Sequence, residues 1–126
     1  MMKFVNLTPH EIVIMQEGKG NIYIPASGVV ARCKQETRIL SPIVTAEGIS
    51  IPCGINSYGD IEGLPKAELG TYFITSSLVA QAAWALGRED VLCPLQAVRD
   101  SEGRIIGTTG LAMPPHTILD EKNWVG

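Results

Sequence analysis

Glycine and proline break this chain into short segments along most of its length. The 126 residues include 13 glycines and 8 prolines, and short runs of β-branched and aromatic residues stand between them. Such runs, bounded by turn residues, are typical of short strands. We therefore expect an all-β or β-dominant α+β fold, a small barrel-like domain of short antiparallel strands with one helix. The length fits a single domain over residues 1–126.

Three hairpins are predicted from pairs of apolar runs that flank turn residues. The pairs are 11–15 with 22–24, 43–45 with 49–51, and 97–99 with 104–107. In the last pair, Asp100 and Gly103 occupy the first and fourth positions of a type I turn, and glycine there is free to adopt positive φ. Of the three predicted hairpins, this last one has the turn residues that most clearly indicate a turn type.

Proline also marks where strands should end. Pro42 and Pro52 are expected at edges or strand ends, because proline cannot donate a hydrogen bond to a sheet ladder. A separate strand is predicted over 37–40 and a strongly apolar one over 71–74. The glycines and proline of 58–65 indicate an irregular loop.

One segment predicts a helix. An apolar run with a single glutamine follows Ser76 and Ser77 and ends before Gly87. Serine is a good N-cap and glycine a common C-terminal stop, so the helix should cover about 77–86. Because the run is apolar on nearly every side, we expect part of it to lie in a subunit interface of a homo-oligomer. The alternative is that its alanine-rich face is weakly hydrophobic and exposed.

The net charge and the hydropathy of the chain limit the classes of partner that it can be expected to bind. The net charge is −3 and the basic residues are scattered, which argues against duplex nucleic acid as a partner. The N-terminus lacks an apolar signal core, and the most apolar stretch is far below the ~20 residues needed to span a bilayer. We therefore expect a cytoplasmic protein with no membrane partner.

Cysteine and histidine spacing indicates no metal site. Cys33, Cys53 and Cys93 are an odd number in unrelated contexts, and neither His10 nor His116 has zinc-ligand spacing from them. Buried, inert thiols are the simpler interpretation. The sequence also lacks phosphate-loop, dinucleotide-binding and nucleophile-elbow motifs. We therefore expect no cofactor and no catalysis.

The segment around His10 has two interpretations. In one, His10 contacts a ligand or acts as a general base, with Asn6 beside it. In the other, Asn6, Thr8 and Pro9 form a tight turn that starts a strand, because the two polar side chains can bond nearby backbone groups. The second interpretation is favoured.

Three further places offer groups that could bind a ligand. Tyr58 stands beside glycines that allow close backbone approach and could stack on a ring, with a surface turn that carries solvated acids as the equal alternative. Ser76 and Ser77 lie at a helix N-terminus, which favours anions but also needs ordinary caps. Arg99 and Arg104 flank a turn and could hold a phosphate, or could pair with the neighbouring acids, which is the commoner outcome.

Several motifs together resemble a family of short proteins encoded in bacteriophage and bacterial genomes. The resemblance covers about residues 3–112. It rests on F-V-N-L-T-P-H at 4–10, I-P-x-S-G-x-x-A-R at 24–32, Y-G-x-x-E-G-L-P at 58–65, Y-F-I-x-x-S-L-V-A at 72–80 and V-R-D-x-x-G-R-I-I-G at 98–107.

A phage setting implies a specific expectation by analogy. Small phage proteins include sponges, which bind and sequester cyclic nucleotide or cyclic ADP-ribose-type immune signals in the host cytoplasm without catalysis. On this anti-defence hypothesis, the ligand-binding residues are Asn6, His10, Arg32, Tyr58, Ser76, Ser77, Arg99 and Arg104. Two alternatives stay open: an interaction module that blocks a host protein or serves the phage particle, and a small hydrolase or lyase that uses His10.

Overall fold

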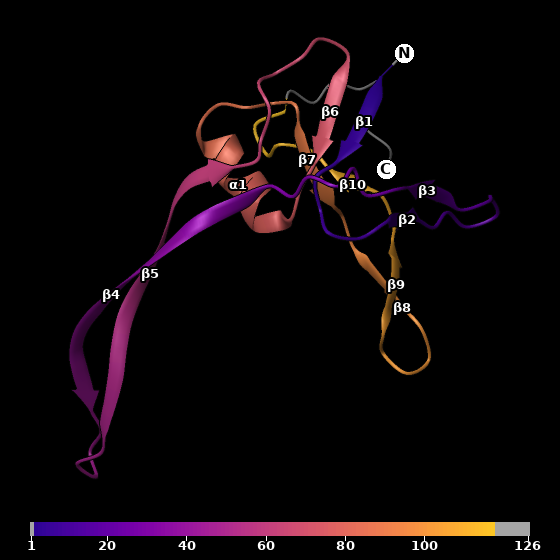
Figure 1. The fold of residues 1–126 in the computed structure, drawn as a ribbon. Coiled ribbons are helices and arrows are strands. Elements are labelled where there is room, and N and C mark those ends of the chain that lie inside the picture. The colour runs from indigo at the N-terminus through magenta and orange to yellow at the C-terminus, as the bar shows by residue number, and fades with distance from the viewer. Residues whose placement is uncertain (1, 118–126) are drawn as a thin grey trace.

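The chain forms a body from which hairpins project, two of them downward in the view and another to the right (Figure 1). The computed structural model describes residues 2–117. One downward hairpin pairs β4 (Arg32–Val44) with β5 (Ser50–Glu62), and the other pairs β8 (Ala97–Arg99) with β9 (Ile105–Thr108). Strands dominate and one helix is present in the described chain, as predicted. Over residues 2–117 the sheets stay open and do not close into the expected barrel, because their edge strands do not pair with one another.

The first sheet is built around a strand–helix–strand unit and has the order β1-β6-β7-β10. Its strands are β1 (Lys3–Asn6), β6 (Thr71–Ile74), β7 (Val91–Pro94) and β10 (Leu111–Ala112). β1, β6 and β7 run parallel, whereas β10 is antiparallel to β7. Parallel neighbours need a long connection, and the helix α1 (Ser77–Ala85) supplies it between β6 and β7. This parallel unit differs from the predicted antiparallel arrangement.

Helix α1 forms where the sequence predicts it. The Ser76 Oγ accepts a hydrogen bond from the Val79 N–H at 3.3 Å and so caps the first turn. Gly87 adopts a φ of 88° just beyond the last turn, a left-handed conformation that ends helices. Val79 and Ala83 are buried against the body, whereas Leu86 is exposed. No helix within residues 2–117 has the length and apolar character needed to cross a membrane.

The second sheet has the order β3-β2-β9-β8. β2 (Ile12–Ile14) and β3 (Ile22–Ile24) form the predicted antiparallel hairpin. β2 and β9 run parallel and are paired only at Ile14 and Thr108 in the described chain. The two hairpins of this sheet therefore diverge away from that pair.

The core lies where both sheets and α1 meet. Phe73 and Ile74 point to opposite faces of β6, and both are buried. Ile74 packs with Ile12 from β2, while Phe73 packs with Leu7 and Val79. A strand that is buried on both faces needs a continuous apolar run, which explains why residues 71–74 are so strongly apolar in sequence.

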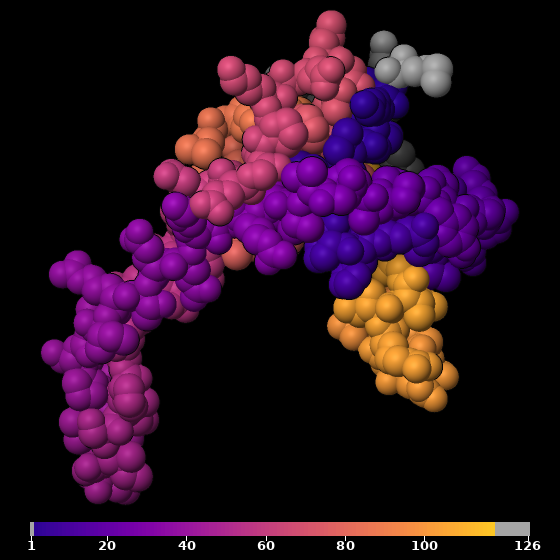
Figure 2. All heavy atoms as spheres, viewed as in Figure 1, coloured from indigo at the N-terminus to yellow at the C-terminus, as the bar shows by residue number. Residues whose placement is uncertain are grey.

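The β4–β5 hairpin, which we call the arm, is the longest element. It joins the predicted strand 37–40 and the predicted hairpin 43–51 into one ladder. Residues 58–62 belong to β5 and do not form the predicted loop. Between the pairs Cys33–Ile61 and Gln35–Tyr58, β5 has one residue more than β4. This bulge accommodates the additional residue, so the strand continues. In Figure 2 most of the arm extends beyond the body, with no other part of the described chain against it.

Candidate functional site

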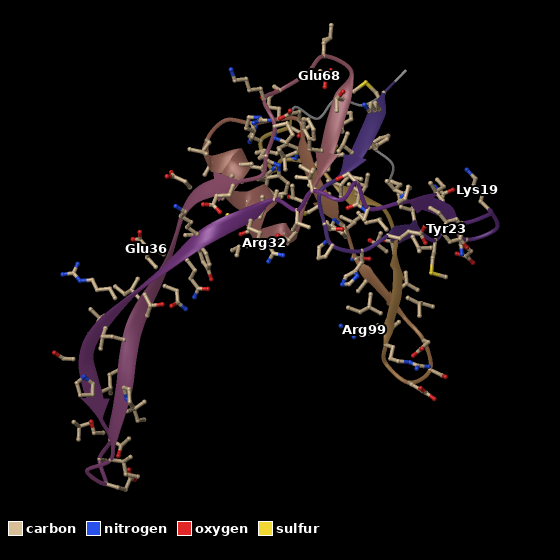
Figure 3. The ribbon with its side chains drawn as sticks, in the orientation of Figure 1. Lys19, Tyr23, Arg32, Glu36, Glu68 and Arg99 are labelled. Carbon is tan, nitrogen blue, oxygen red and sulfur yellow. The ribbon has the colours of Figure 1, made fainter. Side chains whose placement is uncertain are left out.

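The eight residues predicted to bind a ligand lie on separate parts of the molecule. Figure 3 shows Arg32 where the arm leaves the body and Arg99 on the β8–β9 hairpin. Arg32 and Ser76 line the same pocket, whereas Tyr58 and His10 line two other pockets. The arginines of one chain therefore do not converge on one site.

Asn6 is a structural clamp. It is 1% exposed, and its Nδ2 donates hydrogen bonds to the carbonyl oxygens of His10 at 2.8 Å and Ile24 at 3.1 Å. Its Oδ1 accepts from the N–H and the hydroxyl of Thr8, at 2.9 and 2.6 Å. An amide side chain has two donors and two acceptor positions. All four are used within the chain, so this side chain offers no free hydrogen-bonding position to a ligand.

The pocket shared by Arg32 and Ser76 has a volume of about 330 Å³. The turn after β1 forms one wall through Thr8 and Pro9, and the start of β4 contributes Arg32. Ser76, the N-cap of α1, and Leu78 in its first turn line the other side. The volume is within the range of small-molecule sites. Most of the lining is apolar, and Arg32 and Ser76 add a cation and a hydroxyl group, which together can bind an anionic group.

Ser77 lies one residue further along α1 and does not line this pocket. Its hydroxyl accepts a hydrogen bond from the Gln81 Nε2 at 3.1 Å, one helical turn away. Ser77 therefore stabilises the exposed surface of α1.

Tyr58 lines a second, larger pocket of about 750 Å³ between β5 and α1. Arg88 also lines it, but its guanidinium donates to both carboxylate oxygens of Asp90, at 2.8 and 2.9 Å. This hydrogen bonding lowers the pKa of the Asp90 carboxyl and raises that of Arg88. Arg88 also donates to the Pro65 carbonyl at 3.0 Å. The cation of this pocket thus holds together the segments that flank it.

Arg99 and Arg104 are held by their own hairpin. The Arg99 Nη1 donates to the Gly103 carbonyl at 2.7 Å, and Arg104 forms ion pairs with Asp100 and Glu102 at 3.1 and 2.9 Å. Backbone N–H groups of Arg104 and Glu102 donate to Asp100 and lower the pKa of its carboxyl. The predicted turn is confirmed, with Gly103 at a φ of 81°. Pairing with neighbouring acids is therefore the outcome for Arg104, whereas Arg99 bonds a backbone carbonyl of the same turn.

His10 is exposed and lines a largely apolar slot of about 430 Å³. The slot lies where β2 and β9 diverge, and its walls include Val13 and Ile106. The favoured interpretation of the N-terminal segment agrees with this geometry, because Asn6 and Thr8 bond backbone groups in the turn that leads into β2.

The arm carries a feature that the sequence analysis missed. Paired residues of a hairpin point to the same side, and successive residues alternate between sides. The register pairs Leu40 with Cys53 and Ile43 with Ile51, and Ile55 follows Cys53 by two residues on β5. These five residues therefore lie on one face, and we call them the apolar stripe. Arg38 pairs with Ile55 and lies on the same face, at the end of the stripe nearer the body. The four aliphatic members of the stripe are 42% to 63% exposed.

The opposite face of the arm is more polar. There the Thr37 hydroxyl donates to the Asn56 Oδ1 at 2.9 Å, and Gly54 leaves the position opposite Ile39 without a side chain. Ile39 also points to this side and is 78% exposed. The alternation of apolar and small or polar residues from 50 to 56 could have revealed the two faces. Pro52 and Gly54, which indicate turns, lie between the isoleucines and obscured it.

The two prolines of the arm lie near one another. Pro42 falls in the register shift between Leu40 and Ile43, and Pro52 lies across from this shift on β5, between Ile51 and Cys53. Neither residue has a backbone N–H. Each strand of the arm is thus interrupted as a hydrogen-bonding edge near the middle of the stripe.

Comparison with protein-family models, with curated proteins and with solved structures found no match.

Proposed function

We propose that this chain is a protein-interaction module whose contact element is the apolar stripe of the arm. The observation that carries the proposal is a two-faced hairpin with one apolar face and nothing from its own described chain on that face. A hairpin of two strands is marginally stable in water unless a hydrophobic face is covered. Exposed apolar patches of several hundred square ångströms mark interaction sites in monomeric proteins.

The setting that the sequence resemblance suggests fits this role. In a phage, such a module would serve the particle or hold a host protein in the cytoplasm. Homo-oligomeric assembly belongs to the same proposal, since the exposed apolar residues of α1, such as Leu78, add a second surface for contact.

Cross-linking in producing cells tests the role of the arm. We expect an amine-reactive cross-linker to join the tagged chain to a defined protein, identified by mass spectrometry. Replacement of both Ile51 and Ile55 by glutamate should abolish this adduct, because it places two charges on the contact face. The matched control is Ile39→Glu, which adds a charge on the opposite face and should preserve the adduct. Equal adducts from all three proteins would contradict the proposal.

A second candidate function is capture of a small phosphorylated ligand, such as a cyclic nucleotide or a cyclic ADP-ribose-type signal. The pocket of Arg32 and Ser76 favours it, because two residues predicted from distant segments line one cavity. Native mass spectrometry with a panel of cyclic nucleotides should then show a retained ligand that is released unchanged on heating.

The arginines provide a matched pair of variants for this test. Arg32→Ala should weaken binding about tenfold or more, as expected for a lost charge-assisted contact to phosphate. Arg99→Ala should leave binding unchanged, since Arg99 lies on the other hairpin. Retention of no member of the panel, or equal loss in both variants, would exclude this pocket as the site.

A further inference from the structure

We infer that the partner of the apolar stripe is the same stripe on a second copy of this chain, packed antiparallel across a two-fold axis. The inference rests on the proposed function and names its partner. It follows from three properties of the stripe: its chemistry, the placement of the charges at its ends, and its area.

The chemistry of the stripe is self-complementary. Leu40, Ile43, Ile51 and Ile55 offer only aliphatic surface, and Cys53 adds a small, weakly polar group. Two β-sheets with apolar faces pack about 10 Å apart with interdigitated side chains, as in β-sandwiches. Two arms packed in this way form a four-stranded sandwich. Each copy then supplies the layer that the other lacks.

The charges at the ends of the stripe favour an antiparallel arrangement. From residue 37 to residue 57 the chain carries only two charged residues. Arg38 pairs with Ile55 at the inner end of the stripe, and Glu47 lies in the turn at the tip. They are nine positions apart, which corresponds to roughly 30 Å of extended chain. Neither has an ion-pair partner among residues 2–117. An antiparallel two-fold axis brings Arg38 of each copy towards Glu47 of the other.

The area of the stripe is close to that expected of a specific contact. The four aliphatic side chains of one stripe expose on the order of 400 Å², so two stripes bury about 800 Å² of apolar surface. The flanking polar side chains add to this and bring the contact close to the roughly 1,000 Å² expected of a biological interface. A different protein would be expected to recognise the arm partly through complementary charges along its length. Between Arg38 and Glu47 the arm has none.

The first test is the mass of the purified full-length chain in solution, measured by light scattering after size-exclusion chromatography. We expect a dimer, or a multiple of it, for the wild-type chain and for Ile39→Glu. The variant with Ile51→Glu and Ile55→Glu should have half that mass, with self-association weakened at least about a hundredfold. Circular dichroism shows whether the body of each variant is folded.

A second test reverses the end charges, which lie outside the core and so leave the body intact. Arg38→Glu and Glu47→Arg should each raise the dimer dissociation constant by roughly threefold, because like charges then meet across the axis. The double variant should restore wild-type affinity. Within one chain the two residues are too far apart to interact, so the rescue reports contact between copies.

The outcomes separate this inference from the proposed function. A wild-type chain that is monomeric at all concentrations, while the stripe still governs cross-linking to a different protein in cells, overturns the self-association and leaves the interaction role standing. An unchanged mass for the stripe variant, or failure of the double charge reversal to restore affinity, also overturns it. A wild-type chain that is monomeric at all concentrations, and whose cross-linking is the same with and without the stripe substitutions, removes the proposed function as well.

Discussion

Asn6→Asp is expected to lower the free energy of unfolding by about 3–5 kcal/mol at neutral pH. The substitution changes one atom and keeps the shape of the side chain. In the wild-type chain the Nδ2 donates to two carbonyl oxygens at 2.8 and 3.1 Å. In the variant a carboxylate oxygen would take its place and face both carbonyls without a proton between them. The site is 1% exposed, so water cannot compensate.

The loss should also depend on pH. Burial and the facing carbonyls disfavour the charged form, so they should raise the pKa of the new carboxyl in the folded state above its unfolded value of ~3.9. A raised folded pKa means that the variant is relatively most stable below the unfolded pKa. Its stability should fall as pH rises from the unfolded pKa to the folded pKa. Urea unfolding at several pH values measures this trend.

Asn21→Asp is the matched control for this prediction. It makes the same chemical change at an exposed asparagine, where substitutions away from special features shift stability by about 0.5 kcal/mol or less. Equal unfolding midpoints for the two variants would show that Asn6 is not the clamp that its four hydrogen bonds indicate.

Gly63→Ala is expected to destabilise the chain by about 3 kcal/mol or more, for two reasons that add. Gly63 has a φ of 82°, which an L-residue rarely adopts. In addition, a Cβ at this position would lie 2.6 Å from the Val30 carbonyl oxygen. That oxygen belongs to the backbone and cannot move aside as a flexible side chain would. Gly63 follows the last residue of β5, so the strain falls where the arm joins the body.

Gly48→Ala isolates the conformational part of this effect. Gly48 lies in the turn at the tip of the arm with a φ of 86°, and a Cβ added there would meet no neighbouring atom within 4 Å. The substitution should therefore cost only about 1 kcal/mol, the penalty of the left-handed backbone. Thermal unfolding of the two variants compares them directly. A Gly63 variant no less stable than the Gly48 variant would mean that the close approach to Val30 is not a constraint.

Much of the fold could be predicted because its signals are local. The turn at Asp100 and Gly103 and the cap at Ser76 depend on a few neighbouring residues, and both form as expected. The length of the arm could not be predicted. Gly59 indicates a turn, yet the irregularity beside Cys33 lets β5 continue through it. The continuation of β5 depends on its pairing with β4 beside Cys33, and the sequence does not show that pairing.

The candidate site was harder to predict than the fold. Arg99 and Arg104 were predicted either to hold a phosphate or to pair with the neighbouring acids, and their hairpin uses both for its own turn. Asn6 was expected to bond nearby backbone groups or to bind a ligand, and its partners include Ile24, which lies 18 residues away. The sequence could indicate which side chains have binding chemistry. It could not indicate which of them the fold had already engaged.

The prolines of the arm have a consequence for how the protein behaves when it is abundant. Exposed strand edges recruit further strands and can seed amyloid-like fibres. Pro42 and Pro52 remove one backbone donor from each strand, next to the register shift of the arm. Proline on an edge strand is one of the features by which proteins disfavour pairing with a further strand. The chain is thus less prone to polymerise through its edges when it displays a long aliphatic hairpin at high concentration.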